Sequence, residues 1–412
     1  MGSNATTQLD RPPAIRRRSD PPPVAPSFKY IPALDGLRGF SIVLVVVSHF
    51  GFGSVCPGLF GVTVFFFISG FLITRLLLAE MQKHGHIALG SFYARRILRL
   101  YPALLVMIAV VAPIFWKIGG SLTFGDLMSA MFYGSNYHEM AGGNRSGLAN
   151  VVHPFGVLWS LAVEEHYYLF FPLLTLLLGR SLRRFGLCLV MLIVLTTAWR
   201  FHVAAFCASH PHEGFCVFPL RVEHGTDTRI DSILYGAVLA VLLASRAANA
   251  TLRWLRSPLM QFIGALLILA SLADRNPGFR DTWRFTLQGV GLTACVGGVL
   301  YDPRLARIRR LFEHRIVVFV GRLSYSIYLW HWIVLVLASA LLPSWFGLTG
   351  TLPSLGWTVT VFPTLLAASL AAAAASYYGV ERPMLSLRRS FGSHAGEAVP
   401  HPVAQSSLGA HP

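Results

Sequence analysis

The chain has 412 residues, of which 54% are hydrophobic and only 13% are charged, and its mean hydropathy is +0.58. These values exclude an ordinary soluble enzyme and are typical of a protein that crosses a membrane many times. The formal net charge of +16 would suit a nucleic-acid-binding protein. The basic residues, however, gather in short segments between apolar runs, which the positive-inside rule explains without a nucleic acid.

Ten apolar runs are long enough to span a bilayer. Most Lys and Arg residues fall between alternate runs, so the positive-inside rule places both chain ends in the cytoplasm, in agreement with an even number of spans. We therefore predict an all-α integral membrane protein with about ten transmembrane helices. The runs lie at about 37–54, 58–79, 100–118, 156–178, 187–206, 232–246, 257–273, 285–301, 316–342 and 355–380.

The composition divides the chain into one membrane domain and two tails. Residues 1–33 are polar and proline-rich, with the sequence RRRSDPPP in the middle, and residues 389–412 are also polar. Such segments bury too little apolar surface to fold, so both are predicted to be disordered cytoplasmic tails. The membrane domain is predicted to occupy residues 34–388.

Two loops on the predicted outer side are long. The first, 119–155, is rich in Gly, Asn and Ser and is a candidate lid over an outward-facing cavity. The second, 207–230, contains Cys207 and Cys216 on the side that is oxidising if the predicted topology is right. A disulfide between them is possible, but sequence alone does not place the two Cβ atoms, so the pairing stays open.

The first apolar run contains one arginine and one histidine. In LDGLRGFSIVLVVVSHF, Arg38 and His49 stand eleven positions apart. On a helix this spacing returns to nearly the same face and separates the two residues by about 16 Å. Ionisable residues inside a membrane helix usually face a protein interior or a watery cavity. The alternative is that each residue merely lies at one membrane interface.

A second cluster of charge begins the third run. The segment FYARRILRLYP places Arg95, Arg96 and Arg99 three and four residues apart, so their guanidinium groups are predicted to fan over one side of a helix. Arginine suits phosphate because its planar fork binds two oxygens at once. The alternative interpretation is an ordinary basic flank on the cytoplasmic side.

Two adjacent carboxylates enter the fourth run. In LWSLAVEEHYY, Glu164 and Glu165 are neighbours, so they are not expected to face the same direction on a helix. One of them is predicted to point inward, where it could orient an imidazole or accept a proton. The alternative is a pair of structural carboxylates bonded to arginines on neighbouring helices.

Two other polar segments are predicted to be structural. DTRIDSILYG places Asp227, Arg229 and Asp231 at the outer mouth of the sixth run, where opposite charges most simply pair with one another. RLSYSIYLWHW in the ninth run sets hydroxyl groups and His331 among apolar residues. A segment with these aromatic residues is typical of a belt at the membrane interface.

Taken together, seven motifs in this order resemble the membrane acyltransferase-3 family. The resemblance covers about residues 30 to 388, and no hydrolase-like domain follows the last run, so the chain resembles the stand-alone branch. His166 and Tyr167 depart from the Gln-Phe usual in the family, and Ile333 from the proline that commonly follows His-Trp. The motifs are LDGLRG with SH, FFFISGFLIT, FYARRILRLYP, WSLAVEEHYY, RIDSILYG, RLSYSIYLWHW and VERP.

The resemblance implies an O-acyltransferase that uses cytoplasmic acyl-CoA, most simply acetyl-CoA, as donor substrate, with no permanently bound cofactor and no metal. Arg95, Arg96 and Arg99 would hold the phosphates of the coenzyme, and Arg38 could contact the same donor. The acceptor would be a hydroxyl of a cell-surface or secreted glycan. The protein would lie in the inner (plasma) membrane, in contact with the lipid bilayer and with no nucleic acid as partner.

The resemblance also assigns the chemistry to His49, as general base on the acceptor hydroxyl or as a covalent acyl carrier. Glu164 would orient this imidazole, with Glu165 as the second candidate. An alternative acceptor is a glycosylated small molecule such as a macrolide. From other classes, a polysaccharide or lipid-linked sugar transporter should show inverted repeats or broken helices, and neither is seen. A polytopic glycosyltransferase should show acidic motifs in outer loops near the first span, but the outer loop between the first two runs, about 55–57, is very short and has no acidic residue. A non-catalytic sensor would leave Arg38 and His49 unexplained.

Overall fold

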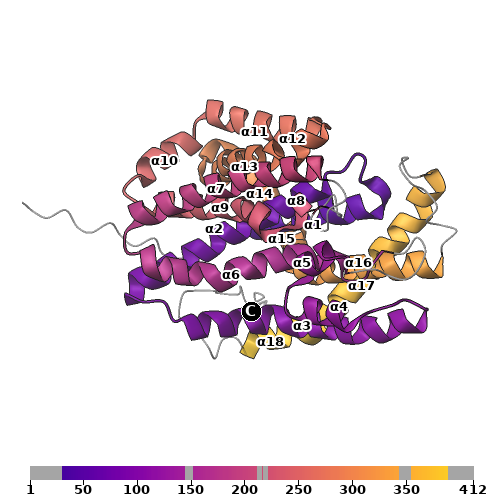
Figure 1. Ribbon diagram of the computed structural model, residues 1–412. Helices are drawn as coiled ribbons and strands as arrows, with labels where there is room; N and C mark the ends of the chain where they lie inside the picture. Colours follow the sequence, from indigo (N-terminus) through magenta and orange to yellow (C-terminus); the bar gives the residue numbers. More distant parts are fainter. Residues whose placement is uncertain (1–29, 144–151, 211–215, 217–220, 343–353, 388–412) are drawn as a thin grey trace, which may run out of the picture.

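The computed structural model describes residues 30–143, 152–210, 216, 221–342 and 354–387, and these are helical with no β-strand among them (Figure 1). The predicted tails lie almost entirely outside the described residues. In chain order the elements are α1 (Pro32–Val47), η1 (Ser48–Phe52), α2 (Gly58–His84), α3 (Leu89–Lys117), α4 (Phe124–Met131), α5 (Ser135–Met140), η2 (Gly156–Leu158), α6 (Trp159–Leu178), α7 (Leu182–Ser209), α8 (Arg221–His224), α9 (Thr226–Ala244), α10 (Ala248–Leu255), α11 (Pro258–Ala273), α12 (Pro277–Asp281), α13 (Trp283–Tyr301), η3 (Pro303–Leu305), α14 (Ala306–Phe312), α15 (Arg315–Arg322), α16 (Ser324–Leu341), η5 (Trp357–Val361), α17 (Phe362–Ser376), η6 (Tyr377–Glu381) and α18 (Arg382–Leu387).

Within these residues, seven helical segments are long and apolar enough to cross a membrane, and α10 and α11, bent by 69°, make an eighth if the pair is one span. Each of the ten predicted runs coincides with one helix or with two or three consecutive helical elements. The prediction of an all-α, multi-pass membrane protein is confirmed. The count of ten spans and the cytoplasmic position of both ends stay predictions.

Helix α2 lies at the centre of the bundle and packs along α9, which in turn packs against α7 and α13 (Figure 1). The two central helices approach closely because each has a glycine at the crossing. Gly70 of α2 faces the carbonyl of Ile233, and Gly236 of α9 faces the carbonyl of Phe67. Such small residues are common where membrane helices meet, since lipid-exposed apolar side chains give no hydrophobic driving force for association.

Replacing Gly236 with alanine is expected to destabilise the bundle, because the new methyl group would meet the backbone of Phe67 and Phe71 on α2. Overpacking of this kind costs about 1–3 kcal/mol. Thermal unfolding in detergent should show a melting temperature several degrees below that of the wild type. The matched control is Gly186→Ala on α7, whose methyl group would lie 3.5 Å from Val241 in ordinary contact. Equal melting temperatures for both variants would contradict this account of the crossing.

Helix α1 packs between α2 and the short helix α15, and Gly39 of α1 faces the backbone of Val317 and Gly321 on α15. It continues into the π-helical turn η1, which includes His49. The turn breaks at Gly51, whose φ of 101° favours glycine. The carbonyl of Phe50 accepts a hydrogen bond of 3.1 Å from the indole of Trp357. The π turn therefore holds His49 at a fixed break in the first span.

The predicted outer loop 119–155 is partly helical, since it contains α4 and α5, while residues 144–151 lie outside the described part. Thr123 caps α4 in a capping box with Asp126, and Oδ1 of Asp126 lies 2.7 Å from Nε2 of His138 on α5. The amide of Asn136 donates to the carbonyl of His224, 3.2 Å away. Hydrogen bonds therefore fasten α5 to α4 and to the neighbouring α8.

The second outer loop is closed by a disulfide between Cys207 and Cys216, the pairing that the sequence left open. Residues 211–215 and 217–220 of this loop lie outside the described residues.

The charged residues that begin α9 do not pair with one another as the sequence suggested. Asp231 binds Arg200 of α7 at 2.8 Å, and both side chains are fully buried. Asp227 binds Arg221, and Arg229 lies 3.7 Å from the ring centroid of Phe285 on α13. The pairing goes to neighbouring elements because buried charges need partners with good geometry, which residues two apart on one helix do not offer.

Candidate active site

A cavity lies between α1, α2, α3, α6 and α16, and one residue between α4 and α5 also lines it. Its lining combines charged, hydroxyl-bearing and apolar side chains. The charged residues are Arg38, Arg96, Arg99, Glu164 and Glu165. The hydroxyl-bearing residues are Tyr133, Ser160, Tyr168, Ser324, Tyr325 and Tyr328.

Three of the four predicted guanidinium groups line this cavity. Arg38 donates from Nε to the hydroxyl of Ser324, 3.3 Å away, and Arg96 lies over the ring of Tyr168 at 5.1 Å. Arg99 makes no hydrogen bond or ion pair within the described part of the chain. Guanidinium groups from the first and third spans therefore meet in one cavity, and their binding of an anionic ligand stays a prediction.

Arg95 is the exception among the predicted arginines. It is buried outside the cavity lining, with its guanidinium 3.6 Å from the carboxylate of Glu80 on α2. Glu80 also accepts a hydrogen bond from the backbone N–H of Ala88. The three guanidinium groups therefore do not share one site, because Arg95 joins α3 to the end of α2 while Arg96 and Arg99 line the cavity. Its predicted contact with a phosphate is not supported by this placement.

Both adjacent carboxylates line the cavity, although only one was expected to point inward. Glu164 accepts hydrogen bonds from Ser69 of α2 and from Tyr168. Glu165 is coupled electrostatically to Arg96 and Arg99 of α3. Neighbouring residues on a helix differ by about 100°, and the cavity extends around that much of α6, so both side chains reach it.

His49 pairs with a second histidine. Its Nδ1 lies 2.9 Å from Nε2 of His331 on α16, and the two rings are nearly parallel. Nδ1 of His331 lies 2.9 Å from the carbonyl of Ile327, and a carbonyl only accepts, so this nitrogen carries the proton. His331 is fully buried and a buried charge is costly, so the neutral ring presents a lone pair at Nε2.

This chain of hydrogen bonds sets the tautomer of His49. Its Nδ1–H donates to His331, so the lone pair of the neutral His49 ring is on Nε2. Within the described residues Nε2 of His49 makes no hydrogen bond, and the ring of Trp332 packs edge-on at 4.9 Å. An imidazole fixed in this form is suited to take a proton from a hydroxyl.

The partner of His49 is therefore His331, whereas Glu164 was predicted to orient the imidazole. Glu164 instead bonds to Ser69 and Tyr168, so the structure does not support that orienting role. Whether Glu164 or Glu165 takes part in the chemistry stays a prediction. The sequence did hold a signal for His331: together with Ser324 and Tyr328 it repeats at intervals of four and three residues, which places all three on one face of α16.

His49 itself does not line the cavity. Helix α16 connects His49 to the cavity. Its Tyr328 lines the cavity, and the Tyr328 ring centroid lies 5.6 Å from that of His331, the partner of His49. Among the described residues, no group of three or more His, Cys, Asp or Glu side chains could hold a metal ion. The site thus consists of the cavity lined by Arg38, Arg96 and Arg99, called the basic cavity below, and the nearby histidine pair, His49 and His331.

Comparisons with known proteins agree with the motifs. The sequence-family model described as an acyltransferase domain matches residues 31–374. The O-acetyltransferase OatA of Staphylococcus aureus (strain NCTC 8325 / PS 47) is 28% identical over 366 residues, which are 86% of this chain and 57% of that protein. The peptidoglycan O-acetyltransferase OatA of Listeria monocytogenes serovar 1/2a (strain ATCC BAA-679 / EGD-e) is 29% identical over 337 residues, 77% of this chain and 51% of that protein.

The chain therefore spans about half the length of the curated relatives it matches. No solved structure matches it significantly. The family model covers most of the chain, including the helices that carry the basic cavity and the histidine pair. The chain belongs to the membrane acyltransferase-3 family.

Proposed function

We propose that this protein is an O-acyltransferase of the inner (plasma) membrane that moves an acyl group, most simply acetyl, from acyl-CoA to a hydroxyl of a cell-envelope glycan. The observation that carries the proposal is the pairing of His49 with His331 beside a cavity with three guanidinium groups. The histidine pair offers a base for a hydroxyl, and the guanidinium groups offer positive charge for the phosphates of a coenzyme. Family membership supports the same reaction class.

In the proposed reaction, Arg38, Arg96 and Arg99 bind the phosphates of the donor at the end of the bundle predicted to be cytoplasmic. The acceptor oxygen attacks the thioester carbonyl while Nε2 of His49 takes the hydroxyl proton. The new C–O bond forms, the C–S bond breaks, and the thiolate of coenzyme A receives the proton from the imidazolium. The acceptor leaves as an ester, and His49 returns to its neutral form.

A glycan of the cell envelope is the first acceptor to test, because the Listeria relative is named for peptidoglycan. A glycosylated small molecule such as a macrolide is the second. The transporter alternative predicts movement of an intact sugar without a new ester bond.

The test uses the full chain in proteoliposomes supplied with radiolabelled acetyl-CoA and fragments of peptidoglycan. Label should appear in the glycan as an ester that mild alkali releases. Propionyl-CoA and a macrolide glycoside serve as the second donor and the second acceptor. If a protein with a normal thermal unfolding transition transfers no label to any acceptor, the proposal fails and transport becomes the better account.

A further inference from the structure

We propose that Tyr328 is a gate that closes the basic cavity toward His49 and so keeps water from the bound thioester. This inference deepens the proposed function and rests on it. The reaction needs the thioester beside His49, yet His49 does not line the cavity that holds the three guanidinium groups. A side chain between the two must therefore set whether the acyl group reaches the base.

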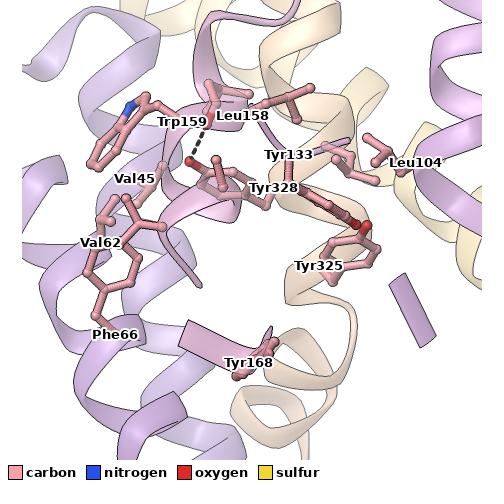
Figure 2. Close-up of a cluster of buried hydrophobic side chains, with 14 of the residues drawn as sticks. Val45, Val62, Phe66, Leu104, Tyr133, Leu158, Trp159, Tyr168, Tyr325 and Tyr328 are labelled. Carbon is pink, nitrogen blue, oxygen red and sulfur yellow. Dashed lines mark hydrogen bonds between the residues drawn. The ribbon is translucent and has the colours of Figure 1, made fainter. Parts of the chain in front are cut away.

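Tyr328 occupies this position. One side of the residue lines the cavity, and its ring centroid lies 5.6 Å from that of His331, the partner of His49. The side chain is buried among Val45, Val62 and Trp159, which come from α1, α2 and α6 (Figure 2). Val45 and Val62 offer no polar group to water on the path from the cavity to the histidine pair, and Trp159 offers only its indole N–H.

The closed position of Tyr328 is held by its hydroxyl group. The phenol donates to the carbonyl of Val157 at 2.9 Å and lies 2.5 Å from the hydroxyl of Ser160. Val157 lies in η2 and Ser160 in the first turn of α6, the helix that carries Glu164 farther along the cavity. A ligand that displaces these residues, or that competes for the phenol, would free the ring to rotate.

Opening the gate without an acceptor should expose the thioester to water. Water then takes the place of the acceptor: its oxygen attacks the carbonyl, Nε2 of His49 takes a proton, and the C–S bond breaks to give acetate and coenzyme A. The expected signature of Tyr328→Ala is therefore acetyl-CoA hydrolysis in the absence of glycan, raised at least about tenfold over wild type. The ratio of hydrolysis to transfer should rise with it.

Two milder variants keep the ring of Tyr328. Tyr328→Phe removes the hydroxyl and both of its hydrogen bonds, and Ser160→Ala removes one of the two partners, so a rise of a few fold is expected from each. They also serve if the alanine variant fails to fold. The matched control is Tyr93→Phe on α3: Tyr93 also donates to a backbone carbonyl, that of Leu169 at 2.8 Å, but it does not line the cavity. It has no ring contact with His331 among the described residues, so its hydrolysis-to-transfer ratio should equal that of wild type.

Two results would contradict the proposal that Tyr328 is a gate. An unchanged ratio in folded Tyr328→Ala and Tyr328→Phe proteins would leave Tyr328 with a packing role. Raised hydrolysis that persists in the double variant with His49→Ala would show that water reaches the thioester without His49. Failure of the proposed function is distinguishable from both, because it appears in the wild type as an absence of acetyl transfer.

Discussion

Replacing His49 with alanine is expected to abolish acetyl transfer, with kcat lowered by a factor of at least about 10², which is the contribution of a positioned general base. The variant should still bind acyl-CoA with unchanged affinity, because the guanidinium groups that line the cavity belong to Arg38, Arg96 and Arg99. The measurement is transfer of radiolabelled acetyl to glycan, with donor binding followed separately by calorimetry. Full activity in a folded His49→Ala protein would remove the central assignment.

Two further variants show whether the effect is specific. His202→Ala removes an exposed histidine of α7 that lies outside the site and stacks on Trp199, so activity should equal that of wild type. His331→Ala removes only the partner that fixes the tautomer of His49, so a smaller loss of kcat is expected, together with an altered pH profile. If His331→Ala lowers only the amount of folded protein, His331 has a packing role alone.

The second large effect is expected from Arg99. Arg99→Gln should raise KM for acyl-CoA about tenfold to a hundredfold with little change in kcat, because a hydrogen bond to a charged group contributes about 1.5–3 kcal/mol. Arg99 lines the cavity and makes no hydrogen bond or ion pair within the described residues, so its charge is available to a phosphate. Steady-state kinetics with varied acetyl-CoA check the prediction.

The matched control for Arg99 is Arg95→Gln, four residues earlier on the same helix. Arg95 is buried against Glu80 and does not line the cavity. Its loss should therefore lower thermal stability and leave KM for acyl-CoA close to that of wild type. A larger rise in KM for Arg95→Gln than for Arg99→Gln would mean that the donor binds elsewhere.

Much of the fold was predictable because a membrane-spanning helix needs a long apolar run, which is visible in the sequence. Each predicted run is helical. The presence of both Arg38 and His49 in the first run identified the helix that contributes to both the cavity and the histidine pair. The short helices of the first outer loop were missed, since α4 and α5 have only eight and six residues. Helices that short depend on their contacts with neighbours.

The contacts within the site were less predictable, because they depend on how distant helices pack. His331 lies 282 positions from His49 in the chain, so no local pattern connects them. Helical periodicity placed Arg95 and Arg99 on one side of α3, yet the end of α2 supplies Glu80 to one of them only. Likewise the inward direction of both Glu164 and Glu165 depends on the width of the cavity rather than on α6 alone.

The charges at the start of α9 have a consequence for how the protein enters the membrane during synthesis. Asp227, Arg229 and Asp231 make this segment a poor substrate for independent insertion, since charged residues in a span carry a large transfer cost. Their partners on α7 and α2, such as Arg200 and Thr63, are translated earlier. We therefore expect α9 to enter the bilayer by packing against helices that have already inserted. The insertion efficiency of α9 should depend on Arg200.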